Sequence, residues 1–211
     1  LALHEHNERD AVNGLVRRLQ SGEDVALISD AGTPLISDPG FRLVRAARAA
    51  GIRCIPVPGA CAAIAALSVA GLPSDRFVFE GFLPPKAAAR RHRLQELAGE
   101  SRTLIFYESS HRVAESLADM RDTLGADREA VLARELTKMF ETVLGEPLAA
   151  LVAKVVADPD QQRAGPVLLV AGSGEEADAK LAEGQRIFAL LRDELPPAKA
   201  AKLAAAISGA P

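Results

Sequence analysis

The sequence predicts an α/β protein, because short apolar runs of strand length alternate with helical patterns along most of the chain. In the first half, the runs Val25–Ile28 and Ile52–Val57 are each followed by a helical pattern, at residues 41–50 and 60–70. This spacing is typical of parallel strands joined by right-handed helical crossovers. Further strand-like runs lie at residues 77–82, 103–107, 130–133, 140–144 and 166–171. We therefore expect two α/β domains.

Proline-rich breaks suggest where these domains end. Leu83-Pro84-Pro85 is the stiffest candidate linker. A boundary near it divides the chain into an N-terminal parallel-sheet α/β domain (residues 1–80), a C-terminal α/β domain (residues 81–174) and a helical tail (residues 175–211). Within these parts, helices are expected at residues 8–20, 86–98 and 110–124, after Pro147, and in the alanine-rich tail.

Composition describes a soluble globular protein, with 48% apolar and 25% charged residues. No apolar run reaches the roughly 18 residues that span a bilayer. The two cysteines, Cys54 and Cys61, suggest neither a disulfide framework nor a zinc site, so we expect a reducing, cytoplasmic location. With a net charge of −3, any contact with nucleic acid has to come from a local basic patch.

The stretch SDAGTPLISDPG, from Ser29 to Gly40, carries more polar chemistry than a plain connector needs. It follows the first predicted strand, and loops at the carboxyl ends of parallel strands are where open α/β sheets bind ligands. Two carboxylates, a threonine hydroxyl and two glycines are available there. An ordinary strand-to-helix turn is the alternative interpretation.

A second turn of small residues, Pro58-Gly59-Ala60-Cys61-Ala62-Ala63, follows the next predicted strand. Small side chains at a helix N-terminus let a ligand approach free backbone N–H groups, although they also allow tight helix packing. Neither turn is a dinucleotide fingerprint or a Walker loop, so a ligand held by backbone and small side chains is favoured over a phosphate cradle. The histidines are too scattered to suggest a metal site.

Charged clusters occur at three further places. Lys86, Arg90, Arg91 and Arg93 lie on one predicted helix, where they form either a solvated face or a phosphate-binding patch. Charged residues also follow two strands, in the segments Arg134–Lys138 and Tyr107–Arg112. Each segment fits a structural ion pair or the rim of a catalytic site, and spacing does not choose between them.

Six segments occur in an order that resembles a known family: SDAGTPLISDPG, VPGACAAIAAL, GLPSDRF, EGFLP, RTLIFYESSHR and ARELTK. The chain resembles the bacterial small-subunit ribosomal RNA methyltransferase I family, ribose 2′-O-methyltransferases of the tetrapyrrole-methylase-like superfamily. The resemblance implies two α/β domains of the tetrapyrrole methylase (class III methyltransferase) type, with S-adenosylmethionine in the cleft between them. It also implies a homodimer that methylates a cytidine ribose in small-subunit ribosomal RNA. The family's first strand and first cofactor loop are not found in this sequence, so we expect the N-terminal domain to be incomplete at its start.

Carried over by position, the resemblance implies a set of cofactor-binding residues. They are Asp30, Gly32, Thr33, Pro34, Leu35, Ile36, Gly59, Ala60, Cys61, Ala62, Tyr107, Leu136, Gly165, Pro166 and Val167.

Methyl transfer to a ribose hydroxyl needs a group that removes or stabilises the hydroxyl proton. We assign Glu135 as base or orienting carboxylate and Lys138 as the nearby cation, with Glu108 and Asp30 as rival bases. No metal is expected. RNA phosphates are expected to bind Lys86, Arg90, Arg91, Arg93 and Arg134. Two other functions remain open: a methylase acting on a tetrapyrrole or other small molecule, and a ribosome-binding module without catalysis.

Overall fold

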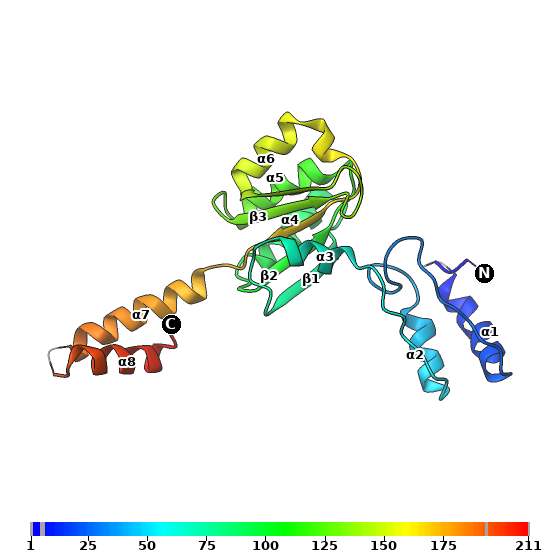
Figure 1. Ribbon diagram of the computed structural model, residues 1–211, viewed down its shortest axis with the longest axis horizontal. Helices are drawn as coiled ribbons and strands as arrows, with labels where there is room; N and C mark the ends of the chain where they lie inside the picture. The colour runs from blue at the N-terminus through cyan, green and yellow to red at the C-terminus, as the bar shows by residue number, and fades with distance from the viewer. Residues whose placement is uncertain (1, 5–6, 193, 211) are drawn as a thin grey trace.

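The computed structural model describes residues 2–4, 7–192 and 194–210. A central body built on one sheet lies between two helix pairs (Figure 1). The N-terminal pair comprises α1 (Glu8–Gln20) and α2 (Phe41–Ala49), and the C-terminal pair comprises α7 (Glu175–Leu191) and α8 (Pro197–Ser208). The two chain ends lie at opposite sides of the molecule (Figure 1). No helix within the described ranges is both long and apolar enough to cross a bilayer.

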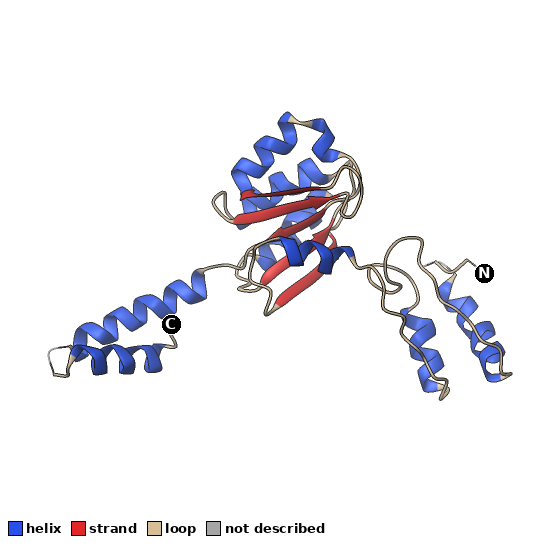
Figure 2. Cartoon of the chain, viewed as in Figure 1, coloured by secondary structure: helices blue, strands red, loops and turns tan. Residues whose placement is uncertain are grey.

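The central sheet has five strands in the order β1-β2-β5-β3-β4 (Figure 2). The strands are β1 (Phe77–Phe82), β2 (Thr103–Tyr107), β3 (Glu129–Arg134), β4 (Thr142–Pro147) and β5 (Val167–Val170). Only β1 and β2 pair in parallel, whereas β2–β5, β5–β3 and β3–β4 are antiparallel. The sheet is therefore mixed, and the α/β class is confirmed.

Helices cover both faces of this sheet, so its central strands are apolar on both sides. On one face lie α4 (Ala87–Leu97), α5 (Val113–Leu124) and α6 (Leu148–Ala157), and a single-turn 3-10 helix (Pro159–Gln162) follows α6. On the other face lies α3 (Ala62–Val69), packed on the strands through Ala63, Ala66 and Leu67. The alternation is visible in β2: Leu104 and Phe106 join the first core, and Ile105 joins the second.

The strands predicted at Val25–Ile28 and Ile52–Val57 are wrong, since the structure forms none there. Both runs have no strand partner among the described residues, and each exposes large apolar side chains: Ile28 is 84% exposed and Val57 is 84% exposed. An apolar run becomes a strand only where a neighbour pairs its backbone amides and carbonyls. The first strand of the sheet is thus β1, so the predicted boundary after residue 80 falls inside β1, and the division into domains stays a prediction.

The N-terminal helices are held together by a small apolar core and by one buried carboxylate. Val12 and Leu15 of α1 pack on Leu43 of α2. Glu8 of α1 accepts hydrogen bonds from the backbone N–H groups of Gly40 (3.2 Å) and Arg42 (2.8 Å). The carboxylate therefore caps the positive N-terminus of α2 from a neighbouring helix.

The strands and helices predicted beyond residue 76 are confirmed, with shifted ends. The hairpin strand predicted from Phe140 begins at Thr142, because the chain first turns through residues 135–141 and leaves Met139 and Phe140 exposed. The helix predicted from Ser110 begins at Val113, after a turn closed by a hydrogen bond from the Arg112 N–H to the Ser109 carbonyl (3.1 Å).

Residues 171–173 connect β5 to the C-terminal helix pair, and hydrogen bonds hold this junction against the central body. The Ser173 backbone N–H donates to the Glu100 carbonyl (2.6 Å) and its hydroxyl to the Gly99 carbonyl (2.9 Å). Arg128 donates to the Ala171 carbonyl (2.8 Å). A Cβ at Gly172 would overlap the backbone of Ser101, so only glycine fits there.

Candidate functional site

A cavity of about 380 Å³ opens at the carboxyl end of β2. Segments far apart in sequence contribute its walls: the loop after Ile28, the start of α3, the ends of β1 and β2, and the start of β5. Its lining residues are Ser29, Asp30, Ala31, Gly32, Thr33, Ile36, Ser37, Asp38, Cys61, Ala62, Phe82, Tyr107, Glu108, Gly165, Pro166 and Val167.

The two glycine-bearing bends predicted from sequence meet at this cavity. The Thr33 hydroxyl donates a hydrogen bond to the Ala60 carbonyl (2.8 Å), which joins the first bend to the second. Gly32 has φ +81°, and a Cβ there would lie 3.6 Å from the same carbonyl oxygen. Because positive φ favours glycine, the residue type suits both the turn and the close approach.

The loop at residues 29–40 also rests on β1, where the strand bulges. Gly81 has φ +66°, and a Cβ there would lie 2.9 Å from the Ser37 hydroxyl oxygen. The register between β1 and β2 shifts between Phe79 and Gly81. This bulge therefore makes room for the loop and turns Phe82 toward the cavity.

Tyr107 lies at the end of β2 and touches most walls of the cavity. Its hydroxyl accepts a hydrogen bond from the Ala63 backbone N–H (3.2 Å), in the first turn of α3. Its ring meets Phe79 and Phe82 edge to face, with centroids 5.0 and 5.8 Å away. Burial raises the pKa of the Tyr107 phenol, so the side chain is neutral at physiological pH.

Glu108, one of the rival bases, lines the cavity but is only 1% exposed, and its carboxylate lies in a dense hydrogen-bonded network. Its carboxylate forms an ion pair with Arg112 (2.7 Å) and accepts hydrogen bonds from the Ser116 hydroxyl (2.6 Å) and the Ser109 backbone N–H (2.7 Å). Arg112 also donates to the Leu83 carbonyl (3.3 Å). The carboxylate is committed inside the fold, which makes Glu108 a poor candidate for accepting a substrate proton.

Backbone strain concentrates beside the cavity. Five non-glycine residues with positive φ occur within the described ranges, and they are Leu35, Ser37, Glu135, Thr137 and Ala164. The first two lie in the loop that lines the cavity, and Ala164 precedes the lining residue Gly165. The other two flank Leu136, which packs against the same buried core cluster as Cys61 and Tyr107. Such strain clusters at functional sites. The sequence does not predict a positive φ for these residue types.

Most of the residues predicted to bind the cofactor border this one cavity. Those that line it are Asp30, Gly32, Thr33, Ile36, Cys61, Ala62, Tyr107, Gly165, Pro166 and Val167. The other five are outside the lining: Pro34, Leu35, Gly59 and Ala60 lie in the loops that form it, and Leu136 lies in the loop between β3 and β4.

Sequence reasoning missed five lining residues: Ser29, Ala31, Ser37, Asp38 and Phe82. The first four belong to the SDAGTPLISDPG stretch and could have been included. Phe82 enters because its strand register pairs it with Tyr107, which sequence alone does not reveal.

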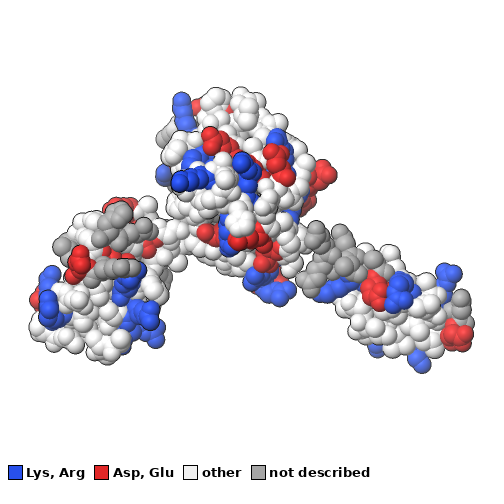
Figure 3. Space-filling model, turned by 180° about the vertical axis from the view of Figure 1, so that it is seen from behind, with Lys and Arg blue, Asp and Glu red and all other residues white. Residues whose placement is uncertain are grey.

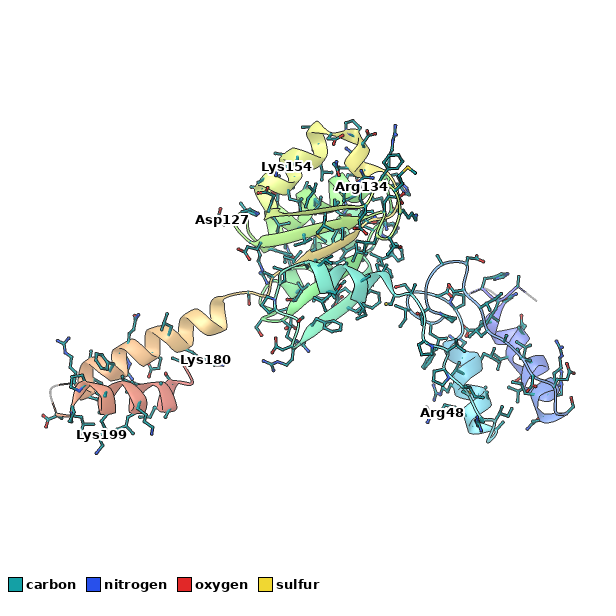
Figure 4. All side chains as sticks on the ribbon, viewed as in Figure 1. Arg48, Asp127, Arg134, Lys154, Lys180 and Lys199 are labelled. Atoms are coloured by element: carbon teal, nitrogen blue, oxygen red, sulfur yellow. The ribbon has the colours of Figure 1, made fainter. Side chains whose placement is uncertain are left out.

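The predicted catalytic pair does not line the cavity, but its loop follows β3, whose Ala133 pairs with the lining residue Val167. Glu135 and Lys138 form an ion pair (2.8 Å) in the loop between β3 and β4. Arg134, at the end of β3 and labelled in Figure 4, is 9% exposed. Its Nε donates a hydrogen bond to the Gln161 side-chain oxygen (3.1 Å). Among the described residues, no group of His, Cys, Asp and Glu could hold a metal ion.

The predicted basic patch on α4 is largely neutralised by acids. Arg90 is 2% exposed and its Nε donates to Asp119 (2.6 Å), so its assignment to RNA phosphates is corrected: it joins α4 to α5. Arg93 forms ion pairs with Glu80 (2.8 Å) and Glu96 (2.7 Å), and these carboxylates raise its pKa. Seen from behind, basic and acidic side chains interleave over the central body (Figure 3).

Solved structures share this fold. The methyltransferase CobJ aligns with a TM-score of 0.58 and 22% identity, over 79% of this chain and 72% of that one. A uroporphyrin-III C-methyltransferase from Thermus thermophilus, complexed with S-adenosylhomocysteine, aligns with a TM-score of 0.51 and 15% identity, over 78% of this chain and 73% of that one.

Sequence relatives are much closer. Proteins named ribosomal RNA small subunit methyltransferase I are 62% identical in Xylella fastidiosa, over 100% of this chain and 77% of the relative, and 64% identical in Pseudomonas aeruginosa, over 99% and 74%. The family model of tetrapyrrole (corrin/porphyrin) methylases matches residues 2–152, and that of the RsmI C-terminal HTH domain matches residues 178–211. The chain therefore belongs to the tetrapyrrole (corrin/porphyrin) methylase family, within the group of ribosomal RNA small subunit methyltransferase I proteins.

Proposed function

We propose that this chain methylates small-subunit ribosomal RNA, and that the methyl group goes from S-adenosylmethionine to the 2′-oxygen of a cytidine ribose. The observation that carries the proposal is the identity above 60% to methyltransferases of that name across the whole chain. The cytidine and the ribose oxygen rest on the resemblance described above. A ribosomal substrate also implies a cytoplasmic enzyme.

The cavity supports S-adenosylmethionine as the methyl donor. Its volume of about 380 Å³ is in the range of small-molecule sites. Phe82 and Tyr107 offer aromatic faces and edges to an adenine, and Asp30 and Asp38 offer carboxylates to a ribose or to a positive charge. Small residues such as Gly32 leave backbone groups accessible. The bound cofactor supplies an electrophilic methyl group on a sulfonium.

Cofactor binding can be followed at one residue. The chain has one tyrosine and no tryptophan, so its intrinsic fluorescence reports Tyr107 alone. Titration with S-adenosylhomocysteine should change this emission, and Gly32→Ala should weaken binding at least tenfold because a side chain at φ +81° strains the turn that lines the cavity. Gly71→Ala is the matched control, since Gly71 has φ +70° but nothing within 4 Å of an added Cβ. Equal affinities of the two variants would contradict a cofactor role for the Gly32 bend.

We propose Glu135 as the base or orienting carboxylate, with Lys138 as its cation. Leu136, between them, packs against the same core cluster as the cavity residues Cys61 and Tyr107, which supports a position on the cavity side of the sheet. Asp30 is the second candidate, favoured by its place in the cavity lining and its exposure to solvent.

The decisive assay is transfer of labelled methyl to small ribosomal subunits, followed by nuclease mapping of a blocked 2′-O linkage. Glu135→Gln and Lys138→Ala should lower the single-turnover rate by about 10² or more if the pair assists proton removal. Glu146→Gln is the control, because Glu146, on β4 of the same hairpin, forms a surface ion pair with Lys154 of α6. Normal rates in both loop variants, together with a slow Asp30→Asn variant, would move the role to Asp30.

The same assay separates the remaining functions. A small-molecule methylase would leave ribosomal subunits unlabelled, and a non-catalytic module would bind them without labelling them. The homodimer stays a prediction, which sedimentation of the purified chain will test.

A further inference from the structure

The stretch between residues 39 and 74 has an unusual charge balance. It contains four arginines, Arg42, Arg45, Arg48 and Arg53, and no lysine, aspartate or glutamate. The chain as a whole carries a net charge of −3, so this stretch is a local positive region in an acidic protein. Local basic regions of this kind are the electrostatic footprint of a polyanionic partner.

The structure leaves three of these arginines without an acidic partner. Arg45 and Arg48 are exposed on α2, three residues apart and therefore on one side of the helix, and Arg53 is exposed just beyond its end. Within the described ranges, no carboxylate forms an ion pair with any of them. Arg42 differs, because its Nε lies 3.9 Å from the buried Glu8 carboxylate. We call Arg45, Arg48 and Arg53 the α2 arginine face.

This face is distinct from the apolar side of α2. Leu43 and Ala47 are buried, and Leu43 packs against α1. Arg48 and Arg53 border a hollow of about 480 Å³ just past the helix end. Arg48 is labelled on the N-terminal helix pair, outside the central body, in Figure 4. The arginines are thus free to contact a large partner without disturbing the helix pair.

The face is tied to the cavity by the chain on both sides. Gly40, at the start of α2, ends the loop that lines the cavity, and the segment after Arg53 leads to the lining residue Cys61. Arg90 and Arg93 on α4 are not both exposed and unpaired in this way: Arg90 is buried, and Arg93 is paired with Glu80 and Glu96.

We propose that the α2 arginine face binds phosphates of the RNA substrate and holds the target ribose at the cavity. This inference rests on the proposed function, because it takes RNA as the substrate. Guanidinium groups suit the task, since they form bidentate hydrogen bonds with phosphate oxygens. The face thus supplies electrostatic affinity that the neutralised α4 patch does not.

The test is the salt dependence of binding to small ribosomal subunits purified from cells that lack this methylation. Each lost phosphate contact lowers the slope of log K against log salt by about 0.7 to 0.9. The triple variant Arg45→Gln, Arg48→Gln, Arg53→Gln should lower the slope by about two and weaken binding at least tenfold at low salt. The triple variant with Lys at the same positions should keep most of the slope, which separates charge from folding.

A matched control removes three arginines that have acidic partners. Arg102, Arg121 and Arg163 pair with Glu100, Asp122 and Asp160, and their replacement by Gln should leave the slope nearly unchanged. If the unsubstituted chain methylates small subunits and both Gln triples keep its slope, the inference is wrong and the proposed function stands. If the unsubstituted chain neither binds nor methylates the subunits, the proposed function fails and this inference fails with it.

Discussion

Two apolar runs of similar length, Thr103–Tyr107 and Ile52–Val57, have opposite structures. The first is β2, whose residues 103–106 are all buried, while in the second Ile55 is 66% and Val57 is 84% exposed. β2 has β1 on one side and β5 on the other. The second run has no paired neighbour among the described residues, and Pro56 within it lacks an N–H to donate.

The comparison shows that an apolar run forms a strand only where neighbouring strands pair with it. Strand propensity measures how well side chains pack against neighbouring strands and helices. The central body supplies those neighbours, and the stretch from residue 25 to residue 61 does not. Four predictions break or sharpen this comparison, from the largest expected effect to the smallest.

The largest effect is expected in the core of the sheet. Phe106→Ala should lower the free energy of unfolding by about 3 to 5 kcal/mol, because Phe106 is fully buried and its removal leaves a cavity. Ile55→Ala should change it by less than about 0.5 kcal/mol, because Ile55 already faces solvent. Urea unfolding followed by circular dichroism measures both. A cost above about 2 kcal/mol for Ile55→Ala would show that the N-terminal run is packed.

The second largest effect concerns the hydrogen bonds that hold the C-terminal junction and the N-terminal helix pair in place. Arg128 donates to the carbonyls of Ala98, Glu100 and Ala171, so Arg128→Met should cost about 3 kcal/mol by leaving partly buried acceptors unpaired. Glu8→Ala removes the cap of α2 and should cost about 1 kcal/mol. Amide hydrogen exchange localises each loss, which should fall on residues 98–101 and 171–173 in the first variant and on α2 in the second.

The contact between the two regions gives a smaller effect. Gly81→Ala should destabilise the chain by about 1 to 2 kcal/mol, since it combines strain at positive φ with a clash against Ser37. Gly71→Ala has the same strain and no clash, so the difference between the variants isolates the contact of the 29–40 loop with β1. Equal unfolding midpoints would indicate that this loop does not rest on the strand.

The smallest effect concerns pH. Hydrogen bonds from Arg102 lower the pKa of Glu100 from its ordinary value of 4.5 to about 2. The stabilisation is therefore present above about pH 4.5 and is lost as the pH falls toward about 2. Arg102→Gln should cost less than about 1 kcal/mol near neutral pH and progressively less below about pH 4. Urea midpoints of both proteins across this range check the sign, and a gap that widens on acidification would contradict it.

The sequence predicted the central body well because its elements carry local signals. The helix expected after Pro147 and the apolar run of β2 follow from local sequence without knowledge of the fold. The lack of strands at residues 25–28 and 52–57 could not be predicted in the same way, because pairing partners are a tertiary property.

The same distinction between local and tertiary signals applies to the residues of the cavity. Its glycine bends could be found in the sequence, since Gly32 is a residue type that a positive φ favours. The entry of Phe82 and the burial of Arg90 depend on strand register and on helix packing, and neither has a local sequence signal.

The junction at Gly172 limits which residue the chain can carry where the C-terminal helix pair is attached. Because its backbone lies against that of Ser101, the last helix pair is attached to the sheet at a point that tolerates no side chain. Any larger residue there would force the backbone at 172 or at Ser101 to shift. The attachment of the C-terminal helix pair to the sheet thus depends on the absence of a Cβ at position 172.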